Sequence, residues 1–181
     1  VEVVHGCEIG EVEGKDGAIA DVKGTNGQNY PADMLGVGLG IVRNVDVLAG
    51  SGIETKTAVI CDDFLQTKDP DVYAAGDSAE YYDPYVGHHS VMGTWDNATN
   101  HGKIVGQNML GAQIPYNEVP TYSTTLFHNR IMAFGATTES DPELEPEMAI
   151  DEAAQNYRRL FFKGDILLGG VIIGARKGFP K

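Results

Sequence analysis

The chain has 181 residues, of which 42% are hydrophobic and 22% are charged, and its formal net charge is -13. This length and composition are typical of globular domains, and the negative charge disfavours binding to nucleic-acid phosphates. The apolar runs are much shorter than the roughly 18 residues that cross a bilayer, so we expect no membrane span. The two cysteines, Cys7 and Cys61, have neither CxxC nor metal-ligand spacing, which fits a reducing cytoplasm and predicts no metal site.

The first 40 residues have the pattern of a β-meander. Asp16-Gly17 and Asn26-Gly27 are turn signals with short apolar runs on both sides. Residues 34–40 are apolar and rich in glycine, which predicts a buried strand that ends in a loop. We expect a short helical turn at residues 46–52 and two further strands at residues 58–61 and 71–75, before a glycine-rich loop at residues 82–93.

A single amphipathic helix is predicted at residues 95–110. Thr94 is a suitable N-cap residue, and Gly111 follows the helix end. Small or apolar residues recur in this helix at steps of three and four: Trp95, Ala98, Gly102, Val105 and Met109. This spacing predicts one buried stripe. Gly102 and Gly106 each cost roughly 1 kcal/mol relative to alanine inside a helix, so we expect another backbone or a ligand to pack closely against them.

The last third of the chain has the pattern of a sheet. Strands are predicted at residues 122–127 and 131–134, an acidic loop at residues 140–146, and a β-hairpin at residues 157–173 around Lys163-Gly164-Asp165. Taken together, the elements indicate an α+β or α/β chain. A β-meander and part of a parallel sheet precede a small α+β domain at the carboxyl end.

The strongest chemical signal lies in residues 67–77, which read TKDPDVYAAGD. This segment predicts a short buried strand that ends in Gly76-Asp77, and ligands of α/β proteins bind at the carboxyl ends of strands. Gly76 permits close approach of a ligand, and Asp77 can accept hydrogen bonds from ligand hydroxyls. The same residues also fit a strand that ends in an ordinary aspartate turn, so the spacing alone leaves both interpretations open.

The string closely resembles the second flavin-binding motif of the FAD-dependent pyridine nucleotide-disulfide reductase superfamily, T-x-x-P-x-I/V-Y-A-A-G-D. The resemblance covers residues 1–138 and implies that Asp77, preceded by Ala75 and Gly76, hydrogen-bonds to the ribityl chain of FAD. The family commonly carries a G-x-R-P-N segment upstream. Residues 40–44 of this chain read GIVRN, so the arginine, Arg43, is displaced and the proline is missing.

The helix that opens with residues 94–98, TWDNA, is similar to the one in the NADH oxidase, rubredoxin reductase and nitrite-reductase-like branch. The resemblance implies that its amino terminus points at the pyrimidine edge of the flavin, with Thr94, Trp95 and Ala98 as contacts. Free N–H groups there would stabilise negative charge on the reduced ring. Phe127 is a further candidate for lining the flavin. Trp95 and Phe127 also fit a purely structural role in a core.

The family's first FAD motif, G-x-G-x-x-G, does not occur in these residues. We therefore interpret the chain as a carboxy-terminal fragment. Residues 1–56 would end an NAD(P)H-binding domain, residues 57–112 would end an FAD-binding domain, and residues 113–181 would form an interface domain.

The resemblance implies a cytoplasmic, dimeric flavoprotein that passes electrons from NAD(P)H through FAD to an acceptor such as a small redox protein. The alternative is a non-catalytic self-association module. The fragment alone is expected to be inactive, to bind FAD weakly and to self-associate, since the pyrophosphate-binding turn is absent from it.

Overall fold

The computed structural model describes residues 2–126 and 128–174. The chain divides into two compact units, Val1–Val42 and Arg43–Lys181. The described residues form mixed sheets with one α-helix, which confirms the predicted α+β class. No helix in this part of the chain is long and apolar enough to cross a membrane.

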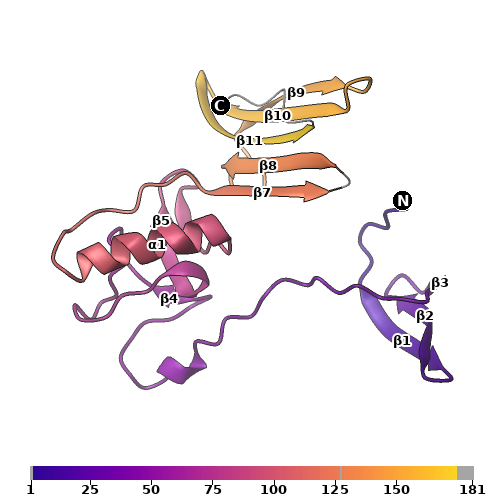
Figure 1. Ribbon diagram of the computed structural model, residues 1–181, viewed down its shortest axis with the longest axis horizontal. Coiled ribbons are helices and arrows are strands. Elements are labelled where there is room, and N and C mark those ends of the chain that lie inside the picture. Colours follow the sequence, from indigo (N-terminus) through magenta and orange to yellow (C-terminus); the bar gives the residue numbers. More distant parts are fainter. Residues whose placement is uncertain (1, 127, 175–181) are drawn as a thin grey trace. The chain divides into compact units, whose positions relative to one another are not determined.

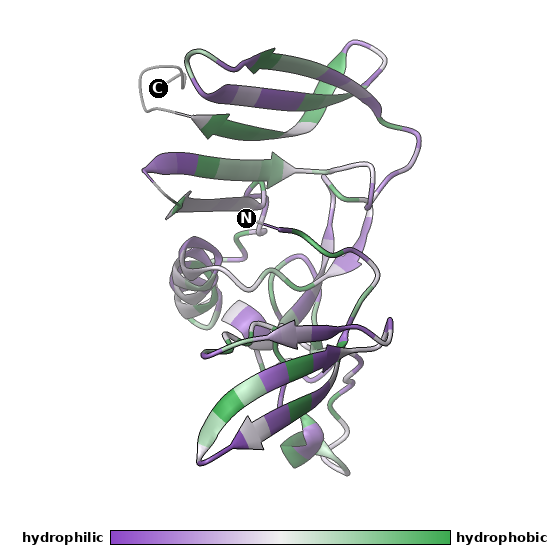
Figure 2. Cartoon of the chain, turned by 90° about the vertical axis from the view of Figure 1, so that its right-hand side faces the viewer, coloured by the Kyte–Doolittle hydropathy of each residue, from purple (hydrophilic) through white to green (hydrophobic). Residues whose placement is uncertain are grey.

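The first unit is the predicted β-meander (Figure 1). Its antiparallel strands are β1 (Ile9–Lys15), β2 (Ala18–Gly24) and β3 (Asn29–Pro31). Asp16 and Gly17 have φ values of 55° and 84°, the positive values that a two-residue hairpin turn requires. Hydrophilic and hydrophobic residues alternate along β1 and β2 (Figure 2), and Val22 supplies the buried side chain of this small unit.

The prediction of a buried strand at residues 34–40 was wrong. These residues have no regular secondary structure, and Met34 and Leu39 are 86% and 85% exposed. A strand needs a neighbour to complete its hydrogen bonds, and no strand in the described part of the chain pairs with this segment. Its glycines also contribute no side chain to a core, so an apolar composition alone did not specify burial.

The second unit begins with η1 (Asp46–Leu48), a 3-10 turn at the predicted position. A three-stranded sheet follows, in the order β4-β5-β6: β4 (Val59–Ile60), β5 (Ala79–Asp83) and β6 (His88–Ser90). β4 and β5 are parallel, which confirms the expected parallel-sheet element. The core below this sheet contains buried apolar and aromatic side chains: Val59, Cys61, Leu65, Ala74, Ala79, Tyr81 and Tyr116.

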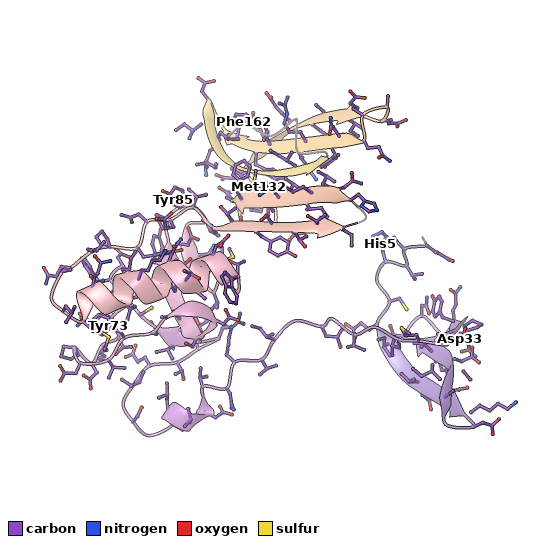
Figure 3. All side chains as sticks on the ribbon, in the orientation of Figure 1. His5, Asp33, Tyr73, Tyr85, Met132 and Phe162 are labelled. Atoms are coloured by element: carbon purple, nitrogen blue, oxygen red, sulfur yellow. The ribbon has the colours of Figure 1, made fainter. Side chains whose placement is uncertain are left out.

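The single loop predicted at residues 82–93 is in fact a hairpin. The Asp83 carboxylate accepts hydrogen bonds from the N–H groups of Tyr85 and Val86, at 2.9 and 3.2 Å, and the chain returns as β6. The side chain of Tyr85 (Figure 3) extends from this turn, and its hydroxyl donates a hydrogen bond to the backbone oxygen of Asn117 at 3.1 Å. The glycines of this segment predicted an irregular loop, but the hydrogen bonds of Asp83 to its own turn favour a hairpin.

The strand predicted at residues 71–75 is also absent as a regular element. One isolated bridge joins Tyr73 to Gln66, and the segment then ends at Gly76, whose φ is 65°. A residue with positive φ cannot continue a strand, so the extended segment is too short to form a ladder. Gly76 and Asp77 consequently lie in the 3-10 turn η2 (Gly76–Ser78), directly before β5, and not at the carboxyl end of a strand.

The helix α1 (Trp95–Asn108) begins and ends close to the predicted residues, and Thr94 is its N-cap. The predicted buried stripe was wrong, because Trp95 and Met109 are 87% and 63% exposed. The buried residues of α1 are polar instead: Asn97, His101 and Asn108. No described atom lies within 4 Å of a Cβ built on Gly102 or Gly106, so the close packing expected there is not formed by these residues.

The buried polar side chains of α1 are held by hydrogen bonds that the apolar periodicity could not reveal. The Asn97 amide donates to the backbone oxygen of Met92 at 2.7 Å. The Asn108 amide donates to the backbone oxygens of Phe64 and Ile114, both at 2.9 Å. Tyr73, which lies beside this helix (Figure 3), places its hydroxyl 3.5 Å from the Asn108 backbone oxygen. Satisfied hydrogen bonds offset the cost of burying these polar groups.

Residues after α1 form a five-stranded antiparallel sheet in the order β7-β8-β11-β10-β9 (Figure 1). Its strands are β7 (Thr121–Leu126), β8 (Asn129–Gly135), β9 (Glu145–Asp151), β10 (Asn156–Lys163) and β11 (Ile166–Gly174). The predicted strands β7 and β8 and the β10–β11 hairpin are confirmed, whereas β9 was missed. The small α+β domain predicted at the carboxyl end was wrong for its described residues, which form strands without a helix. Ala136, Leu144 and Phe161 form its small buried core.

Candidate functional site

The Gly76–Ser78 turn, η2, packs on the first turn of α1. A Cβ built on Gly76 would lie 3.3 Å from the Cβ of Ala98, and the φ of 65° at Gly76 also favours glycine. On the other side of the turn, the Asp77 carboxylate lies 3.7–3.8 Å from a Cβ built on Gly93, the residue before the N-cap. The structure therefore brings together two stretches that are about 20 residues apart in the sequence.

The Asp77 carboxylate faces solvent. The residue is exposed, and among the described residues no group donates a hydrogen bond to its carboxylate oxygens. This carboxylate is available to accept hydrogen bonds from a ligand, as a hydroxyl-binding residue must be.

The amino terminus of α1 supplies donors close to that carboxylate. The Thr94 side chain accepts a hydrogen bond from the Asn97 N–H at 3.3 Å, as an N-cap does. The N–H groups of Trp95 and Asp96 have no acceptor among the described residues. A helix amino terminus with free N–H groups carries about half a positive charge, and it stabilises an electron-rich ligand atom. A polar pocket of about 330 Å³ adjoins Thr94 on the side of residues 116–121.

Five predicted site residues are thus gathered at one place: Ala75, Gly76, Asp77, Thr94 and Ala98. Trp95 directly follows Thr94. Its side chain is 87% exposed, so it does not fill a core, which was the alternative role considered for it. Phe127 lies outside the described residues.

The sequence prediction did not include His101, although this side chain contacts the turn. The Gly76 N–H donates to Nδ1 of His101 at 3.1 Å, and His101 is completely buried. Its ring makes edge-to-face contacts with Tyr81 and Tyr116, with centroids 5.0 and 4.2 Å apart. Burial lowers the pKa of His101 to about 4, so the ring is neutral at pH 7 and Nδ1 is free to accept. The one available signal was helical spacing, since His101 follows Asn97 by four residues.

Arg43 also reaches the turn. From the sequence it was assigned no role, because it is displaced from its position in the family pattern. Its Nε donates to the backbone oxygen of Asp77 at 3.0 Å. The Gly76–Ser78 turn is therefore contacted by two side chains, at the Gly76 N–H from α1 and at the Asp77 backbone oxygen from the segment that precedes η1.

Comparison with known proteins decides the family. Residues 1–102, more than half of the chain, match the model of the pyridine nucleotide-disulphide oxidoreductases. The chain belongs to this family. It is similar to the rubredoxin-NAD(+) reductase of Ectopseudomonas oleovorans, with 25% identity over 177 residues, which cover 98% of this chain and 45% of the relative. The chain thus spans less than half the length of this curated relative.

Solved structures support the same fold. The ferredoxin reductase for the CYP199A2 system from Rhodopseudomonas palustris superimposes with a TM-score of 0.83 and 22% identity, over 95% of this chain and 42% of that one. A FAD-dependent pyridine nucleotide-disulphide oxidoreductase from Desulfovibrio vulgaris gives a TM-score of 0.77 and 20% identity, over 93% of this chain and 44% of that one. The Desulfovibrio vulgaris structure is named as FAD-dependent, and the Ectopseudomonas oleovorans relative is named as an NAD(+) reductase.

The name of the pyridine nucleotide-disulphide oxidoreductases directs attention to cysteine chemistry, yet Cys61 is unsuited to it. Both cysteines are free thiols, and Cys61 is buried with its Sγ 3.5 Å from the backbone oxygen of Glu80. Burial, with the charges of Asp62 and Glu80 adding to it, raises the pKa of the Cys61 thiol to about 12. Because the thiolate is the reactive form, Cys61 is a structural residue in this member of the family.

Proposed function

We propose that the chain is the carboxy-terminal part of a flavoprotein that passes electrons from NAD(P)H through FAD to an acceptor. The observation that carries the proposal is the meeting of Asp77 with the amino terminus of α1, next to Gly93. An unengaged carboxylate and unpaired N–H groups there offer an acceptor and two donors at one site. FAD, when bound, supplies the hydride-accepting chemistry, which no side chain of the site provides.

The hydrogen-bonding groups of this site fit a flavin. Asp77 would accept hydrogen bonds from the ribityl hydroxyls, and the small side chains of Ala75 and Gly76 leave room for the close approach of that chain. The N–H groups of Trp95 and Asp96 would face an electron-rich ring edge and stabilise negative charge on it. His101 is completely buried and neutral, and its Nδ1 is occupied by the Gly76 N–H, so it would take no part in proton transfer.

The wider organisation is also part of this proposal. We assign residues 1–56, 57–112 and 113–181 to the ends of the NAD(P)H-binding and FAD-binding domains and to an interface domain. The separate sheets β1–β3 and β7–β11 support the first and the last of these parts, although the compact unit at the amino end closes at Val42 and not at residue 56. A small redox protein is the proposed electron acceptor, since the relatives are named as rubredoxin and ferredoxin reductases. The free thiols support a cytoplasmic location.

Asp77→Ala tests the proposal in the longest natural polypeptide that contains this chain. We expect FAD affinity to fall roughly 10- to 100-fold, because a hydrogen bond to a charged acceptor contributes about 1.5–3 kcal/mol. Flavin titration measures the change. Asp77→Asn, which keeps one carbonyl acceptor, should lie between the two proteins. Asp71→Ala removes a nearby exposed carboxylate and should leave the affinity unchanged. Equal affinities for all four proteins would remove Asp77 from the flavin site.

A second candidate function, self-association without catalysis, is favoured by the exposed apolar side chains on α1 and just after it: Trp95, Met109 and Leu110.

Residues 1–181 alone should bind FAD weakly or not at all and should associate with themselves. The residues lack the glycine-rich turn that holds a pyrophosphate, so most of the polar anchoring is lost while the entropy cost of binding remains. Light scattering and flavin titration of this chain check both expectations. A monodisperse monomer with one tightly bound FAD would contradict them.

A further inference from the structure

The Gly76–Ser78 turn has little internal support for the position of Asp77. It is a single 3-10 turn, in which the Ala79 N–H bonds to the Gly76 oxygen and the Ser78 hydroxyl donates to the Ala75 oxygen at 2.9 Å. Short 3-10 turns have poor hydrogen-bond geometry, and glycine is the residue with the most backbone freedom. The direction of the Asp77 carboxylate must therefore be set by contacts from outside the turn.

His101 provides such a contact at the start of the turn. Its Nδ1 accepts a hydrogen bond from the Gly76 N–H at 3.1 Å, and the ring is completely buried. Tyr81 and Tyr116 enclose it, and the Tyr116 hydroxyl is fixed in turn by the Asn97 side-chain oxygen at 2.7 Å. The Gly76 N–H is thus tied to a buried aromatic cluster of the second unit.

Arg43 provides a second contact, on the backbone carbonyl that follows the Asp77 Cα. Its Nε donates to the Asp77 backbone oxygen at 3.0 Å, and its partly buried side chain comes from a separate segment of the chain. One bond acts on the N–H of Gly76 and the other on the C=O of Asp77. The backbone on either side of the Asp77 Cα is therefore held while its carboxylate stays free.

We propose that His101 and Arg43 are positioning residues, which clamp the backbone before and after the Asp77 Cα and thereby aim the Asp77 carboxylate at the ligand. The inference rests on the proposed flavin function and adds to it two residues that never touch the flavin. Its competitor is a purely structural role, in which His101 fills the core and Arg43 makes one surface bond.

Two substitutions of His101 separate these roles in the longest natural polypeptide. His101→Phe keeps an aromatic ring between Tyr81 and Tyr116 but removes the acceptor for Gly76. His101→Asn keeps a side-chain oxygen near the position of Nδ1 but removes the ring. Positioning predicts that His101→Phe weakens FAD binding roughly tenfold, the effect of one buried hydrogen bond, and that His101→Asn weakens it less although it lowers the melting temperature more. If FAD affinity simply follows the melting temperature, core filling is the whole role.

A double-mutant cycle with Asp77 gives the decisive measurement. If the clamp acts through the carboxylate, His101→Phe or Arg43→Met combined with Asp77→Ala should bind FAD no more weakly than Asp77→Ala alone. Arg43→Lys, which retains a donor, should recover much of the affinity that Arg43→Met loses. Additive losses would overturn the clamp while leaving the flavin site intact. No effect of Asp77→Ala itself would instead refute the proposed function.

Discussion

Gly169→Ala should destabilise the protein by about 3 kcal/mol or more, the upper end of what overpacking a core costs. Gly169 is buried in β11 and pairs with Gly135 of β8. A Cβ on Gly169 would collide with the backbone oxygen of Ala136, and one on Gly135 with the backbone oxygen of Leu168. Both obstacles are backbone atoms, which have no rotamer to relieve the clash. The strands would have to separate next to Phe161, in the small core of this sheet.

Chemical denaturation with a fluorescence or circular dichroism readout measures the loss of stability. The matched control is Gly164→Asn in the β10–β11 turn, where φ is 59° and no described atom lies within 4 Å of an added Cβ. Asparagine tolerates this backbone, so its cost should stay below about 1 kcal/mol. A Gly169→Ala protein as stable as the parent would show that β8 and β11 do not approach this closely.

The elements that the sequence predicted correctly are specified by neighbouring residues. Asp16-Gly17 supplies the positive φ values of its own turn, and Thr94 caps the helix that it precedes. The β10–β11 hairpin likewise follows from two strand-forming runs around Gly164. Each of these signals acts over a few residues, so no knowledge of the remaining fold was needed to interpret it.

Burial, in contrast, depends on what the rest of the chain brings alongside. Residues 34–40 have a core-like composition but no pairing strand, and the apolar side of α1 is exposed at Trp95. The polar residues Asn97 and His101 are buried although their hydrogen-bond partners, Met92 and Gly76, lie 5 and 25 residues away in the sequence. Hydrophobic periodicity records the composition of a helix face, and it cannot report hydrogen bonds to distant residues.

The candidate site shows the same division. The motif at residues 67–77 pointed to Asp77, and in the structure this carboxylate is exposed beside the start of α1. The expected position at the end of a strand was wrong, since Gly76 breaks the extended segment first. His101 and Arg43 were not assigned to the site, because their role depends on a meeting of three segments that are distant in sequence.

The stability of the protein should fall by about 3 kcal/mol between pH 6.5 and pH 4 on account of His101 alone. Burial lowers the pKa of this imidazole from 6.5 to about 4 in the folded protein. Above pH 6.5 the ring is neutral in the folded and in the unfolded chain, so its titration does not change the free energy of unfolding. Between the two values the unfolded chain binds a proton that the folded protein does not, at about 1.4 kcal/mol per pH unit. Below about pH 4 both states are protonated, and the loss levels off.

Urea denaturation at closely spaced pH values tests this expectation, with His101→Asn as the variant that removes the titrating group. The comparison is a difference between two proteins, because other groups near the ring also titrate. Asp83, which lies close to Tyr81 and Tyr116, has a pKa raised by burial and acts in the opposite direction. The variant should lose most of the slope between pH 6.5 and 4, whereas the exposed control His5→Gln should retain it. Equal slopes in parent and His101→Asn would mean that the buried ring is protonated readily. In that case Nδ1 could not remain the acceptor of the Gly76 N–H at mildly acidic pH, and the turn that carries Asp77 would be released there.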